Sequence, residues 1–92
     1  MKLKYKIQIN EVAGQYVAVA IGEDAKKFKS IVFLNKVGRF IIELLKEETT
    51  ENEIVSSVLN NYEGDSIIIR EETLSFIKRL KELDVIEDGQ GT

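Results

Sequence analysis

The sequence contains no cysteine, histidine, proline or tryptophan in its 92 residues. Without cysteine the chain cannot form a disulfide, a thiolate nucleophile or a cysteine–zinc site. Without histidine it lacks the commonest general base at neutral pH and the commonest side-chain metal ligand. We therefore expect no catalytic residues, no metal site and no enzymatic activity.

Phosphate-binding loops are also missing. Gly22 and Gly38 do not belong to a glycine-rich turn followed by Lys-Ser or Lys-Thr, so nucleotide binding is not indicated and we expect no cofactor. Gly38 is instead predicted to permit close helix packing. Paired carboxylates such as Glu71-Glu72 lie in polar surroundings, and we interpret them as solvated helix ends rather than as a catalytic pair.

Charge and hydropathy fit a single small domain. The chain is 43% hydrophobic and 32% charged, with a formal net charge of −3, and the negative sign argues against nucleic acid as the main partner. The basic start, residues 1–6, leads into an alternating pattern rather than the apolar core of a signal peptide. No apolar run approaches membrane-spanning length. We expect a cytoplasmic protein with no membrane partner.

The first third of the chain has the pattern of β-strands. Residues 3–9 alternate apolar and polar side chains, which is typical of a strand with one solvated face. A second run, 16–21, has Val17, Val19 and Ile21 on one face and the small residues Ala18 and Ala20 on the other, so another element can approach the second face closely. A third strand is predicted at 30–34, and the short links indicate an antiparallel meander.

Three helices are expected after the strands. Apolar residues recur at helical spacing within 37–45, 54–62 and 69–83. Asn35 is a suitable N-cap for the first of these helices, and residues 50–53 (TENE) have the form of a capping box for the second.

The fold class is therefore α+β, with a three-stranded antiparallel sheet followed by three helices. Residues 67–69 fit either a short extended piece or the start of the last helix. We expect one domain over residues 1–87 and a flexible tail at 88–92.

The third predicted strand, 30–34, is a candidate binding edge. An outer strand exposes unpaired backbone groups unless proline, inward charges or a covering element protects it. This strand has no proline and no charge. Composition alone slightly favours a covering helix over a bound peptide.

At helical spacing, the predicted core stripe of the last helix consists of Ile69, Thr73, Phe76, Leu80 and Leu83. Beside it lies a strip of mixed apolar and cationic residues. The strip consists of Arg70, Leu74, Ile77, Lys78 and Lys81. It contains no acid, and it suits an extended ligand with hydrophobic and acidic side chains. Alternatively, Leu74 and Ile77 widen the core and the lysine stems lie along the surface.

Three segments resemble the PqqD-like family in order and spacing. They are residues 31–45 (IVFLNKVGRFIIELL), 49–55 (TTENEIV) and 73–87 (TLSFIKRLKELDVIE). The sequence departs from the family pattern at Val37, Ile42, Thr73 and Asp84, where the family often has Thr, Trp, Asp and Gly.

The resemblance implies a winged-helix-like domain that binds the leader segment of a ribosomally synthesised precursor peptide. In this family the leader adds a strand beside the third strand and packs against the third helix. The expected partners are this leader and a maturation enzyme, often a radical-SAM protein. The predicted peptide-binding residues are Ser30, Ile31, Val32, Phe33, Arg70, Leu74, Ile77, Lys78 and Lys81.

Two alternatives to peptide recognition remain. One is a DNA-binding winged helix, although the second predicted helix, 51–62, contains no cation to place in a groove. The other is a structural subunit of an enzyme complex that uses the strand edge for assembly.

Overall fold

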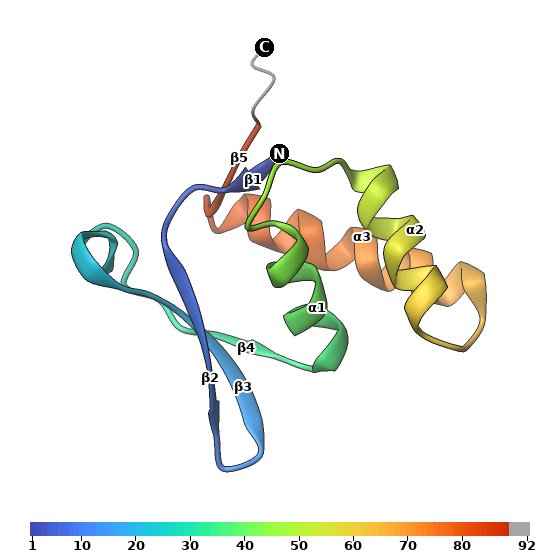
Figure 1. Cartoon of the computed structure of the whole chain (residues 1–92), viewed down its shortest axis with the longest axis horizontal. Helices are drawn as coiled ribbons and strands as arrows, with labels where there is room; N and C mark the ends of the chain where they lie inside the picture. The colour runs from blue at the N-terminus through green and yellow to red at the C-terminus, as the bar shows by residue number, and fades with distance from the viewer. Residues whose placement is uncertain (89–92) are drawn as a thin grey trace.

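The computed structural model describes residues 1–88. The elements are β1 (Lys2–Leu3), β2 (Ile7–Val12), β3 (Gln15–Ala20), the 3-10 helix η1 (Gly22–Lys26), β4 (Val32–Leu34), α1 (Lys36–Leu44), α2 (Glu51–Asn61), α3 (Ser66–Glu82) and β5 (Ile86–Glu87). Figure 1 shows the sheet on one side of the helices. The predicted α+β, winged-helix-like arrangement is confirmed. Of the tail expected at 88–92, only Asp88 lies within the described residues.

Strands β2, β3 and β4 form an antiparallel sheet in that order. Ala18 lies opposite Ile9 on β2 and opposite Val32 on β4. Directly paired residues share a face of the sheet, so Ala18 and Val32 both face the helices, where they are 3% and 4% exposed. The small side chain of Ala18 therefore permits the close approach that the sequence predicted.

The expectation of one strand over residues 3–9 is wrong. Leu3 belongs to β1, which pairs with β5 at the other end of the chain, opposite Ile86. The Leu3 amide also donates to the Leu45 carbonyl at 2.8 Å. The new strand β2 begins only at Ile7. Local alternation gave no indication of β5, because a two-residue strand is specified by its distant partner.

Side-chain caps set the starts of the three helices. Asn35 accepts a hydrogen bond from the Gly38 amide at 2.7 Å, which starts α1. Thr50 and Glu53 form the predicted capping box, with each side chain accepting from the other residue's amide at 3.1 Å. Asp65 caps α3 by accepting from the amides of Ile67 and Ile68. The ambiguous segment 67–69 is therefore helical.

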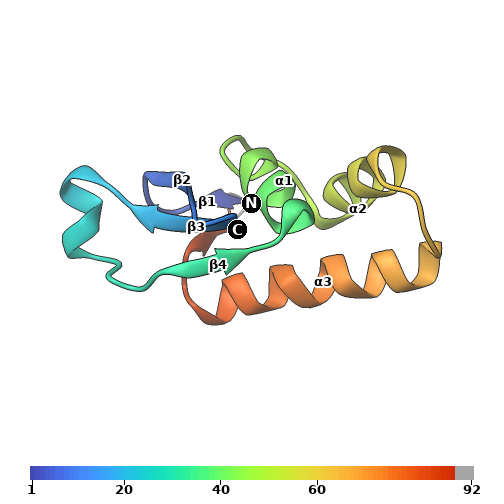
Figure 2. The same cartoon turned by 90° about the horizontal axis from the view of Figure 1, so that it is seen from below.

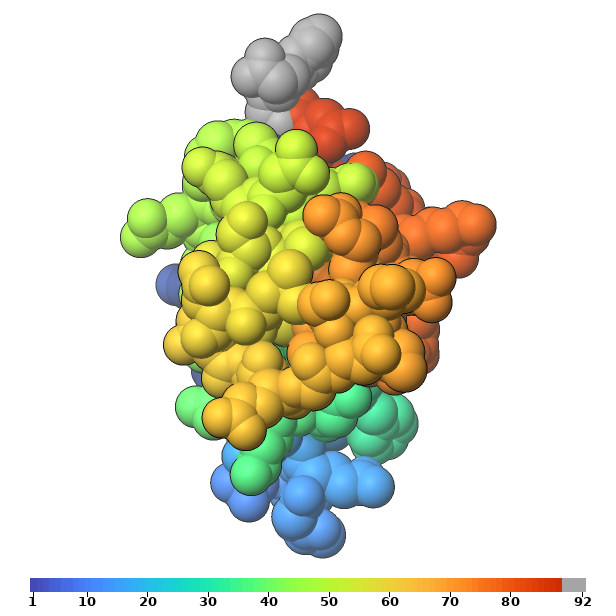
Figure 3. Space-filling view, turned by 90° about the vertical axis from the view of Figure 1, so that its right-hand side faces the viewer, coloured from blue at the N-terminus to red at the C-terminus, as the bar shows by residue number. Residues whose placement is uncertain are grey.

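The hydrophobic core lies between the inner face of the sheet and the three helices. Its most deeply buried side chains are Ile41, Ile42, Leu45, Ile54, Val58, Ile77 and Leu80. Helices α2 and α3 lie side by side and form one face of the molecule, coloured yellow and orange in Figure 3. Among residues 1–88, no helix is both long enough and apolar enough to span a membrane.

Candidate functional site

Strand β4 is an outer strand with one unoccupied edge. It pairs with β3 on one side, and no strand within residues 1–88 pairs with its other side. Val32 and Leu34 anchor it through buried side chains, whereas Phe33 is 62% exposed on the opposite face of the sheet. Backbone groups of an antiparallel strand point alternately to its two neighbours. The free edge of β4 thus offers hydrogen-bonding groups to an added strand.

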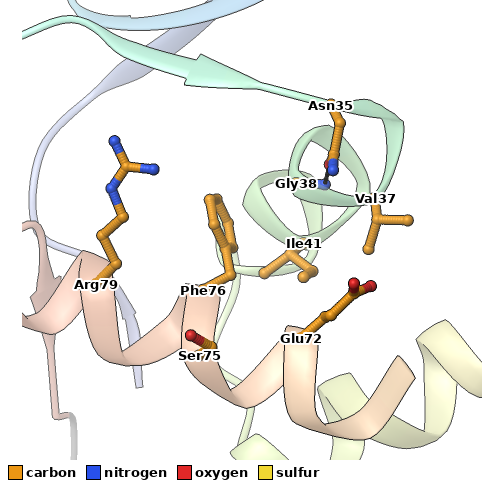
Figure 4. Close-up of a pocket in the computed structure, with 8 residues that line it drawn as sticks. All are labelled: Asn35, Val37, Gly38, Ile41, Glu72, Ser75, Phe76 and Arg79. Atoms are coloured by element: carbon orange, nitrogen blue, oxygen red, sulfur yellow. Dashed lines mark hydrogen bonds between the residues drawn. The ribbon is translucent and has the colours of Figure 1, made fainter. Parts of the chain in front are cut away.

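A depression of about 380 Å³ lies between α1 and α3. We call it the groove; it is lined by Asn35, Val37, Gly38 and Ile41 on one side and by Glu72, Ser75, Phe76 and Arg79 of α3 on the other. Figure 4 shows β4 passing above the groove. The side chains of Glu72, Phe76 and Arg79 extend from α3 into the groove. A peptide on the edge of β4 would therefore have these α3 side chains beneath it.

Gly38 allows the two walls of the groove to approach each other. A β-carbon at this position would lie 3.3 Å from the Phe76 ring and 3.3 Å from the Asn35 side-chain oxygen. These separations are tighter than ordinary van der Waals contact, so a larger residue would displace the ring. The predicted close packing at Gly38 is confirmed, and it sets the position of Phe76 in the groove.

The charged residues of the groove have no electrostatic partners within the described part of the chain. Glu72 and Arg79 are exposed, and neither takes part in the ion pairs formed among residues 1–88. Lys81 differs, because its Nζ lies 2.8 Å from a carboxylate oxygen of Glu51 on α2. This hydrogen bond raises the pKa of Lys81 above its ordinary value. Glu72 and Arg79 are thus the α3 charges available to a ligand in the groove.

The predicted strand residues lie at or beside the free edge. Ser30 and Ile31 precede β4 and are exposed, as is Phe33. Val32 is 4% exposed because its side chain enters the core. Only the backbone of Val32 could therefore meet a ligand, and the binding role of these four residues stays a prediction.

The strip predicted on the last helix is not one open surface, because one of its five residues is buried. Whether the other four contact a ligand stays a prediction. Ile77 has no exposed surface and belongs to the core. Lys81 faces α2 through Glu51, and Arg70 and Leu74 lie on the same flank at helical spacing. Lys78 is exposed. The groove occupies the opposite flank of α3.

The packing of α3 explains why Ile77 is buried and why the groove lies on the flank of Phe76. The helix packs against α2 on one side and against α1 on the other. Its fully buried residues are Thr73, Ile77 and Leu80, whereas Phe76 lies at the margin and lines the groove. The predicted core stripe included Phe76, and Ile77 was placed in the core only by the alternative in which it widens that stripe. The burial of Ile77 supports this alternative.

The residues that sequence reasoning missed are Glu72, Ser75, Phe76 and Arg79. One signal was present, because Glu72 and Arg79 stand one helical turn before and after Phe76 and share its face. Spacing alone does not say which flank of an amphipathic helix meets an open strand. That choice depends on the position of α2.

A second depression, of about 350 Å³, lies on the other flank of α1. It is lined by Tyr16, Lys36, Arg39, Phe40, Glu43 and Tyr62. The Arg39 guanidinium stands 5.1 Å from the centre of the Tyr16 ring, a cation–π contact that already occupies this cation. Tyr16 belongs to the central strand β3, so this depression offers no free strand edge. Within residues 1–88, no cluster of acidic residues could hold a metal ion.

The fold is a small α+β domain in which the outer strand β4 has a free edge and a groove lies between α1 and α3. The family model of coenzyme PQQ synthesis protein D (PqqD) matches residues 15–86, and the chain belongs to this family. The resemblance found in the sequence is thereby confirmed. No curated protein sequence gives a significant match.

Two solved structures share the fold. TbiB1 in complex with the TbiA(beta) leader peptide is similar with a TM-score of 0.69 and 21% identity, over 95% of this chain and 95% of that chain. Lasso peptide synthetase B1 complexed with the leader peptide has a TM-score of 0.60 and 16% identity, over 88% of this chain and 89% of that one. At these identities the likeness establishes a common architecture.

Proposed function

We propose that this chain binds the leader segment of a ribosomally synthesised precursor peptide and presents it to a maturation enzyme. The observation that carries the proposal is the free edge of β4 above the groove. Membership of the PqqD family supports it, as do two relatives of the same fold that are complexed with leader peptides. The chain acts by binding alone, in the cytoplasm, where precursor peptides are made.

The binding mode is the addition of one strand to the sheet. Backbone hydrogen bonds to β4 would each contribute about 0.5–1.5 kcal/mol. Three residues of β4 offer few such bonds, so side-chain anchors must supply most of the affinity. An apolar anchor that fills a pocket can contribute roughly 2 kcal/mol or more. Phe76 and Val37 are half-buried and provide the apolar surface for such an anchor.

An N-methyl scan of a bound peptide tests strand addition. The peptide is taken from a short reading frame beside the gene for this chain, and each of its amides is methylated in turn. Only amides directed toward β4 are needed, so losses of affinity should alternate along the peptide with a period of two. Uniform losses, or losses with a period of three to four, would show a helical or irregular ligand and exclude this mode.

The two alternative functions make different predictions. Helix α2 (Glu51–Asn61) contains no lysine or arginine. It therefore has no cationic side chain with which a DNA-binding winged helix could contact the groove of duplex DNA. A steep salt-dependent affinity for duplex DNA would favour that alternative. A purely structural subunit would bind the maturation enzyme equally well with and without the precursor peptide.

A further inference from the structure

We infer that the groove selects a charge pattern in its peptide: a basic residue, then an apolar residue two positions later, then an acidic residue two positions after that. This inference rests on the proposed function, because it describes the ligand of the same site. It follows from the order of three groove residues on α3, which are Glu72, Phe76 and Arg79.

The charges at the two ends of the groove have opposite sign. Glu72 lies at the end beside the start of α1, and Arg79 lies at the end beneath the chain entering β4 (Figure 4). Neither is neutralised by an ion pair within residues 1–88. Lys29, on the chain entering β4, also lacks an ion-pair partner in the described region, whereas Lys26 and Lys27 pair with Glu23 and Asp24.

The spacing of these residues matches an extended peptide. At about 1.5 Å of rise per residue, Glu72 lies roughly 6 Å from Phe76 along the helix and Arg79 roughly 4.5 Å beyond it. Side chains on one face of an extended peptide recur about every 6.7 Å. The mismatch is about 1–2 Å per step, which the long side chains of Glu72 and Arg79 can absorb. Three alternate peptide residues would therefore face these three side chains in turn.

The direction of the peptide fixes the order of the pattern. Figure 2 shows α3 running along β4 in the opposite direction. Antiparallel strand pairs are slightly more stable per residue than parallel ones, so the added strand should run against β4 and with α3. Its N-terminal part then lies over Glu72 and its C-terminal part over Arg79. The basic residue accordingly precedes the apolar anchor, and the acidic residue follows it.

A random twelve-residue display library is the probe for this pattern. The full chain is used to select peptides, and peptides enriched by the wild type should carry an apolar residue with an acid two positions later and a base two positions earlier. Arg79→Glu should convert the preferred acid to a base, and Glu72→Lys should convert the preferred base to an acid. Each charge preference should be about two- to fivefold for exposed pairs, and it should fade as salt rises from about 0.05 to 0.5 M.

Lys78→Glu is the matched control, because it makes the same charge change at an exposed neighbour of Arg79 that does not line the groove. It should leave the preference unchanged. Enrichment of peptides without a charge preference, or with the reverse order, overturns this inference but leaves leader binding intact. A charge preference that changes in Lys78→Glu but not in Arg79→Glu also overturns the inference. It would favour binding at the strip on the other flank of α3. If no enriched peptide protects β4 amides from exchange, the proposed function fails as well.

Discussion

Replacing Ile77 by alanine separates the two possible roles of α3 residues. The Ile77 side chain has no exposed surface and packs in the core with Leu80. Truncation of such a residue to alanine costs about 2–5 kcal/mol, because apolar contacts are lost and a cavity remains. A chain of 92 residues has a total stability of about 5–14 kcal/mol. The substitution should therefore remove a large share of the stability.

The loss is measured by thermal unfolding followed by circular dichroism, with Arg79→Ala as the comparison. At about 4–8 °C per kcal/mol, Ile77→Ala should lower the thermal midpoint by at least roughly 8 °C. Arg79 is exposed and forms no ion pair in the described part of the chain, so Arg79→Ala should change stability by less than about 0.5 kcal/mol. In the folded state Ile77→Ala should still bind the peptide. An Ile77→Ala protein of unchanged stability that had lost peptide binding would refute this placement of α3.

Two further predictions concern local interactions. Thr50→Ala removes one side of the capping box of α2 and should cost about 0.5–2 kcal/mol in urea unfolding without affecting peptide affinity; a cost near zero would show that the cap is not needed. The hydrogen bond to Glu51 raises the pKa of Lys81 in the folded state above its ordinary value of 10.5. The ion pair therefore stabilises the fold fully below pH 10.5, and its contribution is lost as the pH rises through the pKa of the folded state. The stability difference between wild type and Lys81→Met should thus be constant from about pH 7 to 9 and shrink above 10.5, and a difference that grew in that range would contradict the assignment.

The parts of the fold that the sequence predicts are those specified by nearby residues. The caps at Asn35 and Thr50 depend on contacts three residues away, so their sequence signatures identified both helix starts. The pairing of β1 with β5 depends on residues more than eighty positions apart, and no local pattern indicates it. The first predicted strand was therefore too long at its start.

The site could be predicted only in part for a similar reason. The third strand was a candidate because its lack of proline and charge is visible in the sequence. Composition alone slightly favoured a covering helix, and only the family resemblance indicated a bound peptide at this edge. The face of α3 was not identified, since α3 packs against two helices and its buried arc extends from Thr73 to Leu80. Phe76 is apolar and at core spacing, yet it lies at the margin, where Gly38 leaves room for its ring. The position of the open flank depends on tertiary packing, which one amphipathic pattern does not specify.

Cross-strand nuclear Overhauser effects between a bound peptide and β4 give the most direct test of strand addition at the free edge of the sheet. The labelled chain is saturated with a peptide that it binds, and contacts to the backbone of Val32, Phe33 and Leu34 are recorded. Strand addition at β4 predicts sequential contacts from the peptide backbone to β4, together with contacts from one peptide side chain to the Phe76 ring. A peptide that contacts the α2 flank of the last helix, or the depression around Arg39, while leaving β4 unperturbed would contradict it.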